Sequence, residues 1–289
     1  MIQFLLRVQI KTVFFLFVLF LPEVILGQLF EGSVLLKDTN TGIPFVDVGI
    51  IGKNIGTVTD QSGNFSINLD KINDNDSIRF SMIGYDSKSF LVHTFKEDSL
   101  KTVYLSPKSY YLTEVKVFYH KTRRILLGSP VNTETLKSGF GENNLGSELG
   151  VKINSPGEVQ LLDLNLNIAT CTYDSVTYRL NIYQTIDEVI YKNILTEPIY
   201  VSFTKDKINH TVTFDLQKYS IVVKGDFLVT LELYRDLGEG RLLFYTQYFT
   251  SYTYHKKTSE GKWTKASGAI GMYLHGLLIK RDVYKIQKL

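Results

Sequence analysis

The chain has 289 residues, of which 44% are hydrophobic, and its net charge is +3. Its length exceeds that of a typical domain of about 100–200 residues, so we expect two domains, each with its own core. The balanced charge and the lack of a sustained basic stripe argue against nucleic acid as a partner, because such a partner requires many phosphate contacts.

Residues 1–27 have the pattern of a cleaved export signal. Two basic residues precede an apolar run at residues 13–21, and Pro22 and Glu23 interrupt it. This run is much shorter than the ~20 apolar residues that a membrane-spanning helix needs. We therefore expect cleavage after Gly27, no transmembrane helix in the mature chain, and export to the periplasm or association with the outer membrane.

The first half of the mature chain shows the two-residue period of β-strands. Apolar and polar residues alternate, turn residues separate the runs, and no window of helical length has a sustained 3.6-residue period. The predicted fold class is therefore all-β. The residues expected to face the core are Val34, Leu36, Val46, Val48, Ile50, Phe65, Ile67, Leu69, Ile78, Phe80, Met82, Phe90, Val92, Val103 and Leu105.

Three motifs lie in this half: T-G-x-P at residues 41–44, G-T-x-T-D-x-x-G-x-F at 56–65 and I-G-Y at 83–85. In the second motif Gly63 closes a tight hairpin, where a positive φ has no steric cost. Together the motifs resemble the carboxypeptidase-regulatory-like family. The resemblance implies a transthyretin-like, seven-stranded β-sandwich at residues 28–117, acting as an accessory module. It is carried by Gly32, Thr41, Gly42, Pro44, Val48, Gly56, Thr57, Thr59, Asp60, Gly63, Phe65, Ser81, Ile83, Gly84 and Tyr85.

Similar domains stand at the front of starch-utilisation-type TonB-dependent transporters and of other envelope proteins of Gram-negative bacteria. Residues 112–117 also resemble the L-x-E-V-x-V strand that follows the domain in those transporters. A transporter would next need a plug and a barrel of many strands, each of about 9–11 residues. Residues 118–289 are too few for both, so we expect neither.

The second half resumes the strand pattern after a looser stretch. Residues 118–146 are polar and rich in glycine, which indicates a linker. Strict alternation then predicts a second β-sandwich at residues 147–289, for which a jelly roll is one topology. Its expected core positions are Leu162, Leu164, Leu166, Ile168, Val176, Tyr178, Leu180, Ile182, Val212, Phe214, Leu216, Phe227, Val229, Leu231, Leu233, Ile270, Met272 and Leu274.

Motifs for catalysis, metals and cofactors are missing from the sequence. A zinc carboxypeptidase needs an H-x-x-E element, and none of the five histidines is followed by Glu three residues later. Residues 146–150 do not form a G-x-S-x-G elbow, and residues 139–144 lack the third glycine of a dinucleotide fingerprint. Cys171 is the only cysteine, which leaves no intramolecular disulfide. We expect no enzyme, no metal and no cofactor, with a hydrolase whose site is dispersed along the chain as an alternative.

An aromatic cluster supplies the candidate ligand-binding residues. On a β-strand Tyr248, Tyr252 and Tyr254 share one face, and Trp263 follows on the flank of a hairpin, where we expect partial exposure. Exposed rings of this kind stack on sugars or pack on a partner protein. Core packing and cross-strand pairing are the competing interpretation, because aromatic residues favour strands.

The sequence thus predicts a non-catalytic exported protein of the cell envelope, which acts by binding or assembly through two β-sandwich domains. Envelope proteins and glycans are the candidate partners. The main alternative is a carbohydrate-binding module in the C-terminal domain.

Overall fold

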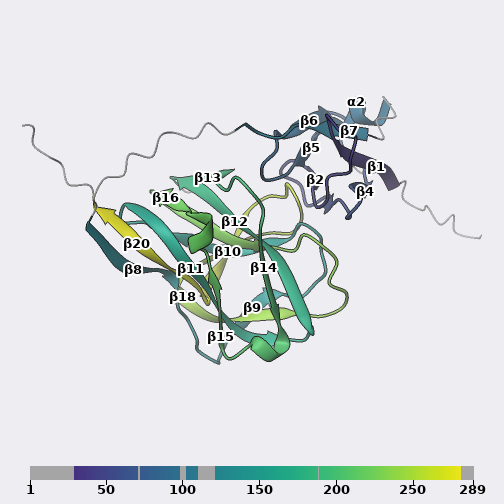
Figure 1. The fold of residues 1–289 in the computed structure, drawn as a ribbon. Coiled ribbons are helices and arrows are strands. Elements are labelled where there is room, and N and C mark those ends of the chain that lie inside the picture. Colours follow the sequence, from purple (N-terminus) through teal and green to yellow (C-terminus); the bar gives the residue numbers. More distant parts are fainter. Residues whose placement is uncertain (1–28, 71, 98–101, 110–120, 188, 281–289) are drawn as a thin grey trace, which may run out of the picture.

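The computed structural model describes residues 29–70, 72–97, 102–109, 121–187 and 189–280. The predicted export signal and the resemblance at residues 112–117 lie outside these ranges. Strands dominate both halves of the described chain, so the predicted all-β fold class is confirmed. Figure 1 shows a smaller domain formed by the N-terminal part of the chain beside a larger one.

The first domain is a β-sandwich of two sheets, with strand orders β4-β1-β7 and β3-β2-β5-β6. All neighbouring strands in these sheets are antiparallel except β1 and β7, which are parallel. Seven strands lie within the described residues of this domain. They are β1 (Leu29–Leu36), β2 (Asp47–Ile50), β3 (Gly56–Val58), β4 (Asn64–Asn68), β5 (Ser77–Ser81), β6 (Lys88–Leu91) and β7 (Thr102–Leu105).

The core of the first domain lies between its two sheets and contains most of the predicted positions. Val34, Val48 and Phe80 are fully buried in it. Val92 is also buried, but it begins a short helix, α2 (Val92–Glu97), which we had expected to be strand. A helix of six residues is too short for a repeating apolar stripe, and its two buried residues do not distinguish it from a strand in the sequence.

The second domain is a larger antiparallel assembly of 13 strands. One layer contains β14, β12, β17, β10, β18 and β19, with β13 at its edge, and the other contains β15, β16, β11, β20 and β8. The long strands β11 and β18 pair with each other and join the layers around one apolar core. The strands are β8 (Lys121–Ser129), β9 (Lys137–Phe140), β10 (Glu148–Ile153), β11 (Glu158–Cys171), β12 (Ser175–Ile186), β13 (Val189–Asn193), β14 (Ile199–Thr204), β15 (Thr211–Asp215), β16 (Val222–Lys224), β17 (Phe227–Glu232), β18 (Leu242–Lys256), β19 (Thr264–Ile270) and β20 (Met272–Lys280).

The expectation of a linker at residues 118–146 is wrong for two segments within it. Strand β8 pairs with β20 and strand β9 pairs with β18, and their residues Leu127 and Phe140 belong to the core of the second domain. The glycines in this segment were taken as a sign of a loop, but Gly128 lies within a strand, where it has a φ of +98° and lies against the backbone of β20. Glycine at a close backbone approach marks an irregular strand as readily as a loop.

The two domains meet through the outer face of the β3-β2-β5-β6 sheet. The loop at residues 257–263, between β18 and β19, lies on that face, and the N–H of Gly52 donates to the carbonyl of Glu260 at 2.9 Å. A Cβ atom at Gly49 would lie 2.2 Å from the carbonyl oxygen of Ser259. Position 49 must therefore be glycine for this loop to approach so closely.

Candidate functional site

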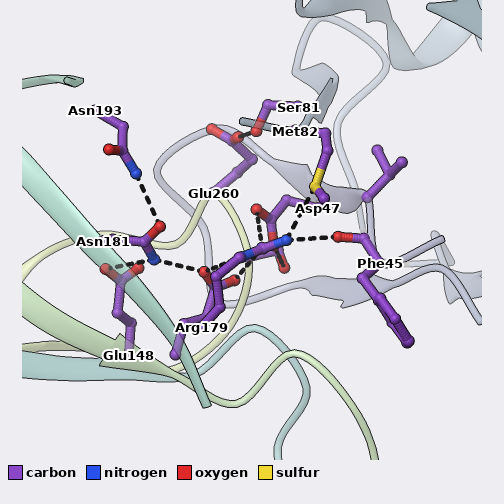
Figure 2. A network of polar contacts seen from close by, with 12 residues as sticks. Phe45, Asp47, Ser81, Met82, Glu148, Arg179, Asn181, Asn193 and Glu260 are labelled. Carbon is purple, nitrogen blue, oxygen red and sulfur yellow. Dashed lines mark hydrogen bonds and ion pairs between the residues drawn. The ribbon is translucent and has the colours of Figure 1, made fainter. Parts of the chain in front are cut away.

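An arginine from the second domain reaches across the interface into the first. Arg179 of β12 donates from Nη2 to Oδ2 of Asp47 at 2.5 Å and from Nη1 to the carbonyl of Phe45 at 2.7 Å (Figure 2). Within its own domain it donates to both oxygens of Glu232, from Nε at 3.0 Å and from Nη2 at 2.8 Å. The Arg179 side chain is only 1% exposed, so this ion cluster is shielded from solvent.

The cluster continues across the sheet to a second ion pair. Lys256 Nζ lies 2.8 Å from Oε2 of Glu148, which also accepts from the hydroxyl of Tyr183 at 3.2 Å. Asn181 connects the two halves, because its amide donates to Glu148 at 3.1 Å and to Glu232 at 2.6 Å (Figure 2). The network is thus continuous from Asp47 in the first domain to Lys256 in the second.

Strand register explains why these side chains meet. Glu148 of β10 lies opposite Glu232 of β17 and opposite Lys256 of β18, while Arg179 of β12 lies opposite Glu232 on its other side. Neighbouring residues on β12 such as Leu180 face the apolar core. The charged residues therefore lie side by side on the outer face of the sheet, which the first domain covers.

The two carboxylates that share Arg179 have opposite pKa shifts. Burial raises the pKa of Asp47 well above its usual value, and the positive charge of Arg179 opposes this effect only in part. Burial also acts to raise the pKa of Glu232, but Arg179 and the hydrogen bond from Asp47 outweigh it and lower that pKa to about 2. Glu232 is thus the firmly ionised partner, and Asp47 is the carboxyl group that retains a proton more readily.

The pKa values of Glu148 and Lys256, the second ion pair, are also shifted by their surroundings. Burial raises the pKa of Glu148, although the neighbouring Lys256 lowers it. Burial alone would lower the pKa of Lys256, but Glu148 and the other nearby negative groups raise it well above the usual value. Each buried charge in the cluster thus has an opposite charge beside it, which is the condition for such groups to be tolerated away from water.

A polar cleft of about 540 Å³ opens beside this cluster, between the domains. The first domain contributes Arg79, Ser81 and Tyr85 to its wall, among others, and the second contributes Tyr183 and Trp263. Asp47 and Lys256 border both the cleft and the buried network. Part of the buried network therefore lines a cavity of the size that small-molecule sites occupy, about 300–1,000 Å³.

Trp263 is the predicted ligand-binding residue that lies in this cleft. It stands just before β19 and is partly exposed, in agreement with the expected position on a hairpin flank. Its ring meets that of Tyr183 edge-on, with centroids 5.7 Å apart and an interplanar angle of 74°. Lys256 Nζ lies 5.3 Å from the Trp263 ring centroid, which ties the aromatic wall to the ion cluster.

The three predicted tyrosines lie elsewhere on β18. Tyr248 and Tyr252 are 47% and 53% exposed, whereas Tyr254 is buried at 5%. The register between β18 and β19 shifts at Tyr252, so the simple alternation that we used does not extend along the whole strand. None of the three borders the interdomain cleft among the described residues, so the structure does not bring the four candidates into one site.

The sequence analysis missed the residues of the ion cluster and the basic residues of the cleft. Arg179 and Asn181 alternate with the predicted core positions Tyr178, Leu180 and Ile182, and the alternation alone does not mark them as buried. One signal was present in the sequence, because the apolar run that became β17 contains Thr230 and ends at Glu232. Every residue of β17 is buried, and an apolar run on both faces of a strand indicates that both faces are covered.

Two kinds of feature were not found in the described part of the chain. No three His, Cys, Asp or Glu side chains are grouped so as to hold a metal ion among these residues. Nor does any described helix have the length and apolar character needed to span a bilayer.

Comparison with known families identifies the class of the first domain. Residues 30–117 match the family model described as the CarboxypepD_reg-like domain. The chain therefore carries a CarboxypepD_reg-like domain, and the prediction made from the motifs at residues 41–44, 56–65 and 83–85 is confirmed for that domain. The match covers less than half of the chain, so it identifies the first domain only.

The remaining comparisons add little to this assignment. No curated protein matches the chain. Among solved structures, the crystal structure of the infectious bursal disease virus VP2 subviral particle is similar at 10% identity and a TM-score of 0.20, over 89% of this chain. The match covers 66% of the viral chain, slightly less than two thirds of its length, and a TM-score this low supports no conclusion about fold or function.

Proposed function

We propose that this chain is a non-catalytic, exported protein of the cell envelope that acts by binding or assembly. The observation that carries the proposal is the bridge from Arg179 to Asp47, because it joins the CarboxypepD_reg-like domain to the second domain as one unit with a cleft between them. The charged groups buried at this interface are engaged in ion pairs, of which the Arg179–Asp47 pair joins the two domains. The leader-like residues 1–27 support export to the periplasm or the outer membrane.

The proposal places the first domain in an accessory role, similar to that of the corresponding domain at the front of TonB-dependent transporters. In this role the domain supplies one wall of the cleft and a platform for the second domain. Candidate partners are other envelope proteins and glycans.

Cell fractionation and activity assays test this proposal. We expect the full chain expressed in a Gram-negative host to be found in the envelope fraction with its leader removed. The purified mature protein should release no product from peptide or glycan libraries. Hydrolysis that copurifies with the folded protein and disappears in Asp47→Asn or Glu148→Gln, both folded as judged by circular dichroism, would favour a dispersed hydrolase site and contradict the proposal.

A second candidate function is carbohydrate binding by the second domain. The partly exposed ring of Trp263 in a cleft with many hydrogen-bonding groups favours it, because amphipathic rings bind sugars through their faces while polar groups bind hydroxyls. A glycan array with the mature protein tests this function. We expect binding that Trp263→Ala abolishes and Tyr252→Ala leaves unchanged; an array with no bound glycan would contradict it.

A further inference from the structure

The interdomain cleft has a surplus of positive charge. Its described lining contains five basic and three acidic side chains, namely Arg79, Lys108, Lys192, Lys256 and Lys262 against Asp47, Asp86 and Glu260. One group of each sign is already neutralised, since Asp47 pairs with Arg179 and Lys256 pairs with Glu148. The remaining lining still has more basic than acidic side chains, so the cleft favours an anionic ligand.

Arg79 provides the most specific anion-binding group in this lining. It lies on the outward face of β5, between the buried residues Ile78 and Phe80, and Nη2 donates to the hydroxyl of Ser87 at 3.1 Å. Its Nε is 4.0 Å from Oε1 of Glu260 and has no hydrogen-bond acceptor among the described residues, although it is buried.

Glu260 leaves terminal N–H groups of this guanidinium unused. Its Oε1, the oxygen nearest to Arg79, accepts from the hydroxyl of Ser81 at 2.6 Å and lies 4.0 Å from Nε, beyond hydrogen-bond distance. The buried Nε–H is closed to a ligand, but the Arg79 side chain is 41% exposed, so a ligand reaches it through the terminal N–H groups. A planar guanidinium with unused N–H groups fits a carboxylate, which accepts two parallel hydrogen bonds from it.

The part of the lining that comes from the second domain is an aromatic wall. Trp263 and Tyr183 meet edge-on in it, and Tyr191, which is 50% exposed, also lines the cleft. Such a wall offers rigid ring faces to a ligand at a small cost in conformational entropy. A ligand that fits both walls must therefore carry a negative group and a flat or ring-shaped body with apolar C–H surface.

We propose that the interdomain cleft binds an acidic carbohydrate, with the carboxylate of the sugar accepting hydrogen bonds from Arg79 and the sugar ring against Trp263. The lysines around the cleft add general attraction for the negative charge. The inference rests on the proposed carbohydrate-binding function and goes further by placing the site between the two domains and by assigning recognition of the acidic group to the first domain.

Titration calorimetry of the full mature chain tests this inference with two probes of equal length, a galacturonic acid oligosaccharide and a galactose oligosaccharide. We expect the acidic probe to bind at least about tenfold more tightly, and increasing salt to weaken only its binding. Arg79→Gln should remove about tenfold or more of the affinity for the acidic probe and leave the neutral one unchanged. Trp263→Ala should weaken both, and Arg123→Gln, which changes an exposed arginine on β8, should weaken neither.

The outcomes separate this inference from the broader function, provided that each variant unfolds in urea at the midpoint of the wild type. Equal binding of both probes, with no effect of Arg79→Gln, would overturn the assignment of an acidic ligand and leave carbohydrate binding intact. Binding that depends on Tyr252 and not on Trp263 would overturn the location in the cleft. If neither probe binds the folded wild type, both the inference and carbohydrate binding by this cleft are wrong.

Discussion

The two faces of strand β12 are both buried, but one face consists of apolar side chains and the other of charged and polar side chains. Tyr178, Leu180 and Ile182 point into the apolar core of the second domain. Arg179 and Asn181 point the other way, into the interface with the first domain, and are as well buried as the core residues. One strand thus faces an apolar core on one side and a network of charges and hydrogen bonds on the other.

This difference shows what each contact contributes. An apolar core tolerates several arrangements of similar volume, because the hydrophobic effect has no direction. Arg179 satisfies Asp47, Glu232 and the carbonyl of Phe45 only in one relative position of the domains. We infer that the core stabilises the second domain, while the ion cluster selects a single docking of the first domain upon it.

Breaking the ion cluster should have the largest effect. Arg179→Ala leaves Asp47 and Glu232 buried without their counter-charge, and we expect the free energy of unfolding to fall by about 3–5 kcal/mol. Urea unfolding followed by circular dichroism measures this loss. Arg123→Ala, which removes an exposed arginine, should change the same quantity by no more than about 0.5 kcal/mol. Similar small effects in both variants would contradict the role of the cluster.

Acid should weaken the same cluster through Glu232. Because its pKa is lowered from 4.5 to about 2 in the folded protein, its ionised form stabilises the fold above pH 4.5 by about 3 kcal/mol, and this contribution is lost as the pH falls toward 2. Asp47 and Glu148 act in the opposite sense, since a raised pKa favours folding at low pH. Glu232→Gln isolates the effect of Glu232.

The measurement is the difference in unfolding free energy between wild type and Glu232→Gln at several pH values. We expect that difference to be largest near neutral pH and to shrink between pH 4.5 and 2. A difference that stays constant over this range would show that the charge of Glu232 does not stabilise the fold. Asp215→Asn, which changes an exposed carboxylate on β15 outside the ion cluster, serves as the matched control.

The sequence predicted the apolar faces of the strands well and the polar interface not at all. Alternation places Val48, Phe80 and Leu180 correctly because each strand has one face in the core of its own domain. The same alternation places Arg179 on the polar face of its strand, but a sequence pattern along one strand contains no information about the first domain, which covers that face. Asp47 pairs with Arg179, which lies 132 positions further along the chain, and this pairing cannot be derived from local spacing.

The aromatic cluster shows a similar limit. Trp263 could be placed on a hairpin flank from its flanking polar residues, but its position in the cleft depends on the docking of the first domain. The tyrosines of β18 were assigned one face by strict alternation, which the register shift at Tyr252 interrupts. Irregularities of this kind follow from pairing with β19 and have no clear mark in the sequence.

A smaller loss of stability is expected from a substitution at Gly49, where the backbones of the two domains lie in close contact. Gly49→Val places a side chain against the carbonyl of Ser259 and should weaken the docking of the two domains by about 1–3 kcal/mol. The strand itself should persist, because valine favours β-structure. Trp263 is the only tryptophan and lies at the interface, so a shift of its fluorescence reports undocking. Gly141→Val should leave the emission unchanged, because a Cβ atom at position 141 has no neighbouring atom within 4 Å.

The smallest effect should come from the exposed end of the aromatic cluster. Tyr252 is 53% exposed and its ring lies 5.7 Å from Nζ of Lys265, so Tyr252→Ala should cost no more than about 1 kcal/mol of unfolding free energy. Tyr254, two residues further along the strand, is buried, and Tyr254→Ala should cost about 3–5 kcal/mol. Urea unfolding of both variants measures the contrast. Equal losses would mean that Tyr252 is part of the core, whereas the expected inequality leaves its ring available at the surface, outside the cleft that contains Trp263.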